Sequence, residues 1–355
     1  MVDQVKANFV QKKLKKDFYK NAGQHGWIVG TTGSGKTDFM IEVLRNLKET
    51  VPKETIIWRD YGKESEMLAI LQFHDIKLFH PTGTEIKISK MNKKQQNLLD
   101  HEVEFYEFKD AKDILNNLDK KGVNAIAERR FIKTPALFIS FWSNFFQEFI
   151  NMALSYELPR PLSFFIDEMN NITPADGHYF APNQSQLIQL LVYNAQNLRA
   201  LEARLIPSTQ GLASLNKGIR LQMQYYFFKR CNENIDIDIR RFKLAQVPVQ
   251  RLRTNQVIIA GPSREYSDPI DSIPRRLPPK SFLPTMIYEG EYMPPVTESF
   301  KTQSENQELK EELSDFKKKA VINLRKTGMA YHKIADNLGI SSQTAYEYCN
   351  PKDKK

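Results

Sequence analysis

The sequence predicts an α/β protein with a mainly parallel central sheet and a small all-α domain at its carboxyl end. Two patterns support this prediction. Short apolar segments typical of strands alternate with helical segments between residues 27 and 228, which is the order of βαβ units. A run of prolines between residues 274 and 295 then separates this region from a charged, helical tail. The length of 355 residues suits one domain of ordinary size and a smaller one.

The elements follow one another in a regular order. A Lys-rich arm occupies residues 1–22, and the α/β domain residues 23–273. Strands are expected at residues 27–29, 55–58, 76–79, 85–88, 123–127, 162–166, 204–206 and 225–228. Helices are expected at residues 38–47, 67–71, 110–118 and 186–201, and another opens at Thr134-Pro135. Six apolar side chains lie on one face of this last helix and are interpreted as core: Phe138, Phe141, Trp142, Phe145, Phe149 and Met152.

The composition indicates a folded, basic protein. An apolar fraction of 41% is enough for a sizeable core, which excludes a disordered chain. The net charge of +9 favours a polyanionic partner, nucleic acid before an anionic membrane surface, although a protein that is incidentally basic explains it equally well. The most apolar segment, residues 136–154, contains too many polar side chains for a membrane span. We therefore expect no span and a cytoplasmic protein.

Residues 30–37 match the phosphate-binding pattern G-x-x-x-x-G-K-[ST] and lie between a predicted strand and a predicted helix. Gly33 and Gly35 let the backbone N–H groups turn toward phosphates. Lys36 would neutralise the β- and γ-phosphates, and the Thr37 hydroxyl would bind Mg²⁺. ATP and Mg²⁺ are the predicted cofactors. The predicted nucleotide-binding residues are Gly30, Thr31, Thr32, Gly33, Ser34, Gly35, Lys36 and Thr37.

The apolar strand at residues 162–166 ends in Asp167 and Glu168. By itself this pattern also fits a strand that leads into a solvated turn. With the phosphate loop upstream, it predicts that Asp167 holds Mg²⁺ through water and that Glu168 is the general base. The long separation leaves room for a further strand–helix unit, as in RecA-like and AAA+ ATPases. Gln210, after a third strand, is a candidate contact of the lytic water or γ-phosphate, unless it belongs to an ordinary turn.

These motifs resemble the HerA/FtsK superfamily of DNA-pumping ATPases, which includes conjugative coupling proteins and viral packaging ATPases. The resemblance rests on the phosphate loop, F-F-I-D-E at residues 164–168, Arg199 before the strand that ends in Thr209-Gln210, and D-Y-G-K-E at residues 60–64. It implies a homohexameric ring around DNA with ATP at the subunit interfaces.

A ring of this kind implies an arginine supplied by the neighbouring subunit to stabilise charge on the γ-phosphate. Arg230 is the first candidate and Arg220 the second, and for each an ordinary surface arginine remains the alternative. A basic set that could face a DNA channel consists of Lys217, Arg240, Arg241, Arg251 and Arg253.

The tail, residues 314–355, follows a linker at residues 274–313. Its predicted helices, at residues 316–325, 331–338 and 342–349, resemble the helix-turn-helix of resolvases and small regulators. A helical bundle for protein contacts is the alternative. The candidate DNA-contacting residues are Ser342, Gln343, Thr344, Tyr346 and Lys333.

The function predicted from these features is an ATP-driven translocase of duplex DNA. By analogy, the chain's compact size favours viral genome packaging or plasmid transfer, with a viral or plasmid assembly partner. The alternatives are an ATP-gated DNA-binding regulator and a protein-secretion or assembly ATPase.

Overall fold

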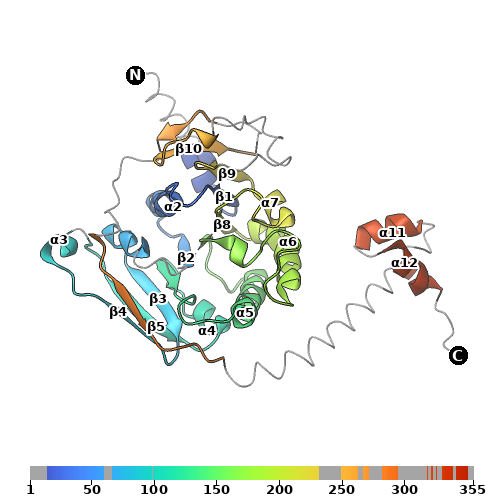
Figure 1. Ribbon diagram of the computed structural model, residues 1–355, viewed down its shortest axis with the longest axis horizontal. Helices are drawn as coiled ribbons and strands as arrows, with labels where there is room; N and C mark the ends of the chain where they lie inside the picture. Colours follow the sequence, from blue (N-terminus) through green and yellow to red (C-terminus); the bar gives the residue numbers. More distant parts are fainter. Residues whose placement is uncertain are drawn as a thin grey trace. The chain divides into compact units, whose positions relative to one another are not determined.

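The computed structural model describes residues 14–59, 66–97, 99–231, 249–262, 267–271, 282–294, 318, 321–322, 325, 330–338 and 341–350. The chain forms two compact units, Met1–Tyr292 and Met293–Lys355. The first unit contains a ten-stranded sheet with the strand order β11-β10-β9-β1-β8-β7-β2-β6-β3-β5. Figure 1 shows this sheet with helices packed around it.

Seven neighbouring strand pairs in this sheet are parallel, and only the pairs β9–β10 and β10–β11 are antiparallel. The predicted mainly parallel α/β fold is therefore confirmed. The strands are β1 (Gly26–Val29), β2 (Thr55–Arg59), β3 (Ile76–Pro81), β5 (Val103–Phe108), β6 (Val123–Ile126), β7 (Leu162–Ile166), β8 (Ala203–Thr209), β9 (Tyr225–Phe228), β10 (Gln256–Ala260) and β11 (Ile270–Asp271).

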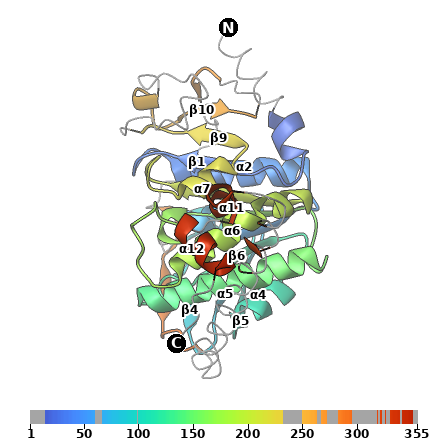
Figure 2. The ribbon, with the colours of Figure 1, turned by 90° about the vertical axis from the view of Figure 1, so that its right-hand side faces the viewer.

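Helices cover both faces of the sheet. The helices α4 (Ala111–Asn116), α5 (Pro135–Leu154), α6 (Gln184–Ala200) and α7 (Lys217–Leu221) pack side by side on one face, while α2 (Lys36–Thr50) and the 3₁₀ helix η2 (Glu66–Gln72) share the other (Figures 1 and 2). Every residue of β1, β2 and β7 is consequently buried. The six apolar side chains predicted to form one face of α5 are all buried, which confirms their interpretation as core.

The predicted linker at residues 274–313 is wrong for its central part. Strand β12 (Met286–Glu289) pairs antiparallel with β4 (Glu85–Ile88), so this stretch belongs to the first unit. Its partner lies about 200 residues earlier in the chain, and no local pattern announces such a pairing. The sequence analysis also missed β5, whose glutamates obscure its strand character, and the short helix α3 (Lys93–Gln96).

The described part of the N-terminal arm packs on its own domain. The π-helix η1 (Lys15–Tyr19) places the fully buried Phe18 ring 4.8 Å from the ring of Tyr225 and 5.4 Å from that of Phe227. The guanidinium of Arg204 donates to the carbonyl oxygen of Asn21 at 3.2 Å. This segment is therefore part of the core, and residues 1–13 lie outside the described residues.

A buried histidine joins α6 to β8. His25 Nδ1 accepts a hydrogen bond from the Leu205 N–H at 3.0 Å, and its Nε2 lies 2.8 Å from the carbonyl oxygen of Ala195. Because Nδ1 accepts, Nε2 carries the proton and donates, so the ring is neutral. Burial lowers the pKa of His25 from 6.5 to about 4, and the bond to Ala195 opposes this shift.

Acid is expected to destabilise the first unit through His25. Between pH 6.5 and 4 the unfolded chain binds a proton that the folded ring excludes, so the free energy of unfolding falls as the pH falls. The full loss amounts to about 3 kcal/mol. Urea unfolding of wild type and His25→Asn at several pH values tests this. A wild-type dependence that the variant retains undiminished would assign the effect to other groups.

The second unit contains α11 (Tyr331–Leu338) and α12 (Ser342–Cys349), with the bounds that the sequence predicts. Ser341 caps α12, because its Oγ accepts the Thr344 N–H at 3.0 Å. The buried Ala345 and the ring contact between Tyr331 and Tyr346, 5.4 Å between centroids, hold the unit together. Most of the predicted helix at residues 316–325 lies outside the described residues. Among the helices described, none is both long and apolar enough to cross a membrane.

Candidate ATP-binding and hydrolysis site

Three neighbouring strands bring the predicted site residues to one edge of the sheet. Strand β8 lies between β1, which leads into the phosphate loop, and β7, which ends at Asp167. Strand β8 follows both motifs in the sequence but lies between their strands in the sheet. All three strands are parallel, so their carboxyl ends meet at the same edge. The bond from the Gly30 N–H to the Thr209 carbonyl oxygen, 3.2 Å, joins the loop directly to the end of β8.

The loop has a backbone suited to phosphate. Gly33 and Gly35 take positive φ angles of 75° and 79°, which side-chain-bearing residues rarely adopt. A Cβ on Gly35 would also lie only 2.9 Å from the carbonyl oxygen of Thr254. Helix α2 begins immediately afterwards at Lys36, and its first N–H groups have no partner within the helix. These donors, at the positive end of a 15-residue helix, form a cradle for an anion.

Two side chains connect the cradle to its surroundings. Lys36 is buried, and its Nζ donates to the carbonyl oxygens of Gly30 at 2.9 Å and Thr31 at 3.4 Å, which holds its charge against the loop. The Thr32 hydroxyl donates to Gln210 Oε1 at 3.3 Å. The predicted γ-phosphate contact Gln210 is therefore brought to the phosphate loop, from the end of β8.

Asp167 and Glu168 follow β7 and are both buried. The hydroxyl of Ser208, on β8, donates to Asp167 Oδ1 and accepts the Glu168 N–H at 3.3 Å. The sequence analysis assigned no role to Ser208, although its place two residues before Gln210 is a usable signal. One hydroxyl thus fixes the side chain of the first acidic residue and the backbone of the second.

The backbone of Glu168 is strained. Its φ and ψ of 52° and 51° lie in the left-handed region, which is costly for a residue with a side chain. The Asn171 N–H and Nδ2 both donate to the Glu168 carbonyl oxygen, at 3.0 and 3.1 Å. Arg59 Nη1 donates to the Asp167 carbonyl oxygen at 2.8 Å. These donors hold the turn that orients the carboxylate.

Arg59 is itself held by a buried network that the sequence analysis missed. Its Nε donates to Glu128 Oε1 at 2.9 Å, and both side chains are fully buried. Trp142 Nε1 donates to the same oxygen at 3.2 Å. Burial raises the pKa of Glu128, and the neighbouring Arg59 guanidinium opposes the rise. A charged residue at the end of each of two apolar strands, β2 and β6, is the sequence signal that could have revealed the pair.

A second lysine lies behind the loop. Lys229 follows β9, is 1% exposed, and donates from Nζ to the carbonyl oxygen of Thr254 at 2.8 Å. Burial lowers its pKa to about 8, while the Asp38 carboxylate opposes the shift. A Cβ on Gly30 would lie 2.6 Å from Lys229 Cβ, so the lysine stem packs directly against the loop.

The two arginine candidates have different surroundings. Arg220 is only 8% exposed, and its Nη1 donates to the Leu212 carbonyl oxygen at 3.2 Å. Its guanidinium is thus held within its own domain, and its role toward a neighbouring subunit stays a prediction. The carbonyl oxygen of Arg230 accepts the Thr31 N–H at 2.9 Å, which places its backbone beside its own chain's phosphate loop. Its role toward a neighbour stays a prediction.

The residues predicted to contact DNA lie mostly on the surface, as far as the structure describes them. In the tail, Ser342, Gln343, Tyr346 and Lys333 are exposed, whereas Thr344 is half-buried at the start of α12. In the first unit, Lys217, Arg251 and Arg253 are exposed. Arg240, Arg241 and the turn at residues 60–64 lie outside the described residues. The contacts of all these residues with DNA stay predictions.

The donors at this edge suit Mg²⁺. Thr37 supplies a hydroxyl at the start of α2, and Asp167 supplies a carboxylate oxygen. Mg²⁺ prefers oxygen ligands and binds through one or two carboxylates together with substrate phosphates and water. Among the described residues there is no group of three or more His, Cys, Asp or Glu that could hold a metal.

A scan against protein-family models found no matching family, and a search of curated proteins found no matching protein. Solved structures are similar in fold. The genome packaging NTPase B204 from Sulfolobus turreted icosahedral virus 2, in complex with AMPPCP, is 14% identical with a TM-score of 0.41, over 71% of this chain and 98% of that one. EccC (ATPases 2 and 3) from Thermomonospora curvata, in complex with a signal sequence peptide, is 13% identical with a TM-score of 0.40, over 73% of this chain and 38% of that one.

EssC (ATPases 2 and 3) from Geobacillus thermodenitrificans is 12% identical with a TM-score of 0.37, over 73% of this chain and 40% of that one. Because each TM-score is below 0.5, what these proteins bind does not transfer to this chain by similarity alone. The helix-turn-helix resemblance of the tail stays a prediction.

Proposed function

We propose that this chain is a Mg²⁺-dependent ATPase of the HerA/FtsK type that moves DNA. The observation that carries the ATPase assignment is the convergence of the phosphate loop, the Asp167–Glu168 turn and Gln210 at one sheet edge. A loop that cradles phosphate is common to many nucleotide-binding proteins. The buried carboxylate of Glu168 adds the general base that hydrolysis requires. It follows β7, which is separated from β1 by β8 alone.

Each residue then has a distinct task. The loop N–H groups and Lys36 bind the β- and γ-phosphates, while Thr37 and Asp167 hold Mg²⁺. Bound Mg²⁺ neutralises charge on the phosphate oxygens. Glu168 accepts a proton from the water that attacks the γ-phosphate, so its fixed position determines the line of attack. Gln210, bonded to Thr32, senses whether the γ-phosphate is present.

The DNA part of the proposal rests on charge and on the tail. The net charge of +9 suits a polyanionic track, and α12 presents exposed polar side chains at its start. The working form is a hexameric ring, in which Arg230 of one subunit completes the site of the next. Viral genome packaging or plasmid transfer is the process that this assembly serves, together with a viral or plasmid assembly partner.

ATP turnover by the full chain, with and without duplex DNA, tests the proposal. Duplex DNA is expected to raise the rate severalfold at low salt, and the increase should fall steeply as salt rises. Lys36→Ala should abolish turnover in both conditions, whereas Lys53→Ala, which changes an exposed lysine beyond the end of α2, should not. If duplex DNA leaves the rate of ATP turnover unchanged, the translocase hypothesis is wrong, and a regulator or a secretion ATPase is favoured. If the chain does not hydrolyse ATP in either condition, the ATPase assignment itself is wrong.

A further inference from the structure

Lys229 lies against both ends of the phosphate loop. Its backbone N–H donates to the Val29 carbonyl oxygen at 2.8 Å, which fixes the residue beside the end of β1. A Cβ on Gly30, the first residue of the loop, would lie 2.6 Å from Lys229 Cβ. A Cβ on Gly35, the last residue before α2, would lie 3.7 Å from Lys229 Nζ. The side chain therefore runs behind the loop from its start to its end.

The ammonium group of Lys229 also holds a neighbouring turn in place. Its Nζ donates at 2.8 Å to the carbonyl oxygen of Thr254, in the turn before β10. The same oxygen would lie 2.9 Å from a Cβ on Gly35, so the turn closes on the loop where a glycine leaves room for it. One side chain thus joins the end of β9, the phosphate loop and the turn.

The charge of Lys229 is buried at the positive end of α2. Gly35 is the N-cap of this helix, and a helix N-terminus favours anions over cations. Charged residues also lie on the elements packed around Lys229: Asp38 and Lys36 on α2, Arg230 after β9, and Arg253 just before Thr254. Burial lowers the pKa of Lys229 to about 8, and Asp38 opposes this shift. A bound polyphosphate adds negative charge, which stabilises a cation in such a place.

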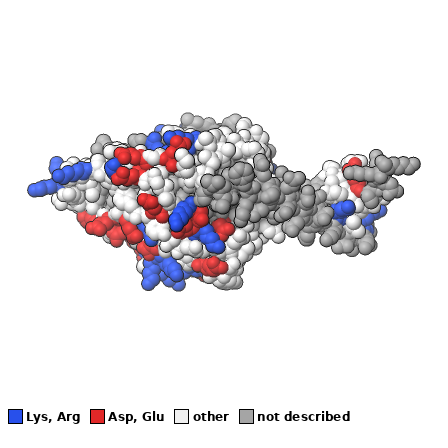
Figure 3. Space-filling model, turned by 90° about the horizontal axis from the view of Figure 1, so that it is seen from below, with Lys and Arg blue, Asp and Glu red and all other residues white. Residues whose placement is uncertain are grey.

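Burial distinguishes this charge from the lysines and arginines on the surface. On the face of the first unit in Figure 3, Lys and Arg lie interspersed with Asp and Glu. Water and salt screen exposed charges, whereas a charge inside the protein is screened much less. Lys229 is only 1% exposed, so its ammonium group acts on a nearby anion more strongly than a surface lysine does.

We propose that Lys229 is a positioning residue for the phosphates of ATP. Its contacts keep the loop between β1 and the turn at Thr254, and its charge adds to that of Lys36 at the cradle. The inference deepens the proposed function and rests on it in taking ATP as the ligand. Phosphates stabilise the protonated ammonium, so their binding raises the pKa of Lys229 above about 8. The contribution to ATP affinity is therefore complete below this pH and falls as the pH rises above it.

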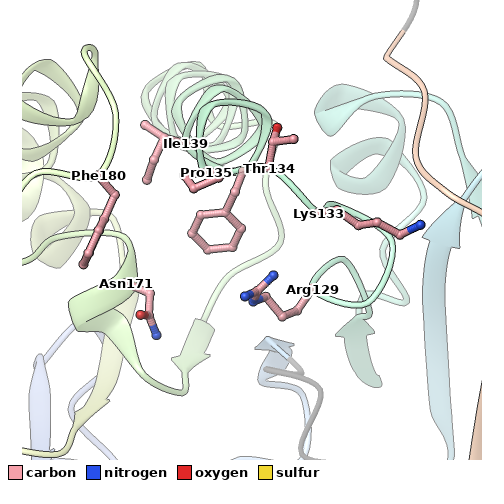
Figure 4. A pocket seen from close by; sticks show the side chains of 8 residues that line it. Arg129, Lys133, Thr134, Pro135, Ile139, Asn171 and Phe180 are labelled. Carbon is pink, nitrogen blue, oxygen red and sulfur yellow. The ribbon is translucent and has the colours of Figure 1, made fainter.

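A separate cavity at the same edge of the sheet provides one control. It has a volume of about 220 Å³ and lies near the carboxyl ends of β6 and β7. Its lining residues come from the loop after β6, the start of α5 and the segment between β7 and α6. Figure 4 shows the side chains of Arg129, Asn171 and Phe180 pointing into it. Phe180→Ala therefore alters this edge of the sheet away from Lys229.

Binding of a fluorescent, non-hydrolysable ATP analogue to the full chain tests the inference. Anisotropy is measured with Mg²⁺ between about pH 7 and pH 9, on either side of the pKa of Lys229. At the lower pH, Lys229→Met is expected to weaken binding by roughly 10- to 100-fold, because a nearby buried charge is lost. The ratio of wild-type to variant affinity should then shrink as the pH rises, since wild type loses the same charge.

A second buried lysine provides the matched control. The Lys48 Nζ donates to the carbonyl oxygens of Pro52, Glu54 and Lys121, at the far end of α2. Lys48→Met is expected to lower the Tm, as Lys229→Met does, but to bind the analogue like wild type. Phe180→Ala should also bind it like wild type.

Three outcomes would overturn the role of Lys229. One is binding by Lys229→Met within about threefold of wild type at the lower pH. Another is an affinity ratio that is the same at both ends of the pH range, because the lysine then acts by packing alone. The third is an equal loss of affinity in Lys48→Met, which would assign the effect to lower stability. All three leave the ATPase assignment intact, whereas a wild type that does not bind the analogue would overturn that assignment and the inference with it.

Discussion

Replacing Glu168 with glutamine is expected to lower ATP turnover by about 10²- to 10⁴-fold, the usual contribution of a positioned general base. Glutamine keeps the size of the side chain but does not accept the proton of the attacking water. The left-handed turn and the bonds from Asn171 and Arg59 involve the backbone, so they persist in the variant. ATP affinity should therefore stay close to wild type, because the phosphate loop is unchanged.

Steady-state turnover and binding of a fluorescent ATP analogue separate these two effects. Glu157→Gln is the matched control, since Glu157 is an exposed carboxylate shortly before β7. Turnover by Glu168→Gln within about threefold of wild type would show that another group activates the water. A variant that loses turnover and binding together would indicate a disturbed turn, and Glu168 would then be a positioning residue.

Replacing Arg59 with methionine is expected to destabilise the first unit by about 3–5 kcal/mol, because Glu128 then stays buried without its cationic partner. This corresponds to a fall in Tm of about 10 °C for a unit of this size. Turnover should also fall, since the Asp167 carbonyl oxygen loses the donor that braces the catalytic turn.

A second variant separates the two roles of Arg59. In Arg59→Met/Glu128→Gln the buried charge is removed and Trp142 keeps an acceptor, so much of the stability should return. Turnover should stay low, because no donor replaces the guanidinium. Thermal melts and turnover of wild type and both variants give the comparison. A single variant as stable as wild type would contradict a net contribution from the ion pair, and full turnover in the double variant would contradict the bracing role.

Local pattern determined the phosphate loop, the acidic strand end and most element positions in the first unit. Residues 30–37 act through their own backbone angles and the helix that follows, so eight consecutive residues specify the cradle. The bounds of β7 and β9 coincide with their predicted ranges, because a short and mostly apolar run marks a strand covered on both faces. The side chains on α5 repeat with the helical period, and their burial follows from that period alone.

Tertiary structure decided which distant residues share the site. The Arg59–Glu128 pair joins the ends of β2 and β6, and Ser208 reaches Asp167 only because β8 is inserted beside β7. The pairing of β12 with β4 likewise joins stretches that lie far apart in the sequence. Each depends on strand order, which is set by the packing of the whole sheet and not by any short stretch of residues. The residues that would bind and hydrolyse ATP could therefore be predicted from the sequence. The residues that hold them in position could be found only from the tertiary structure.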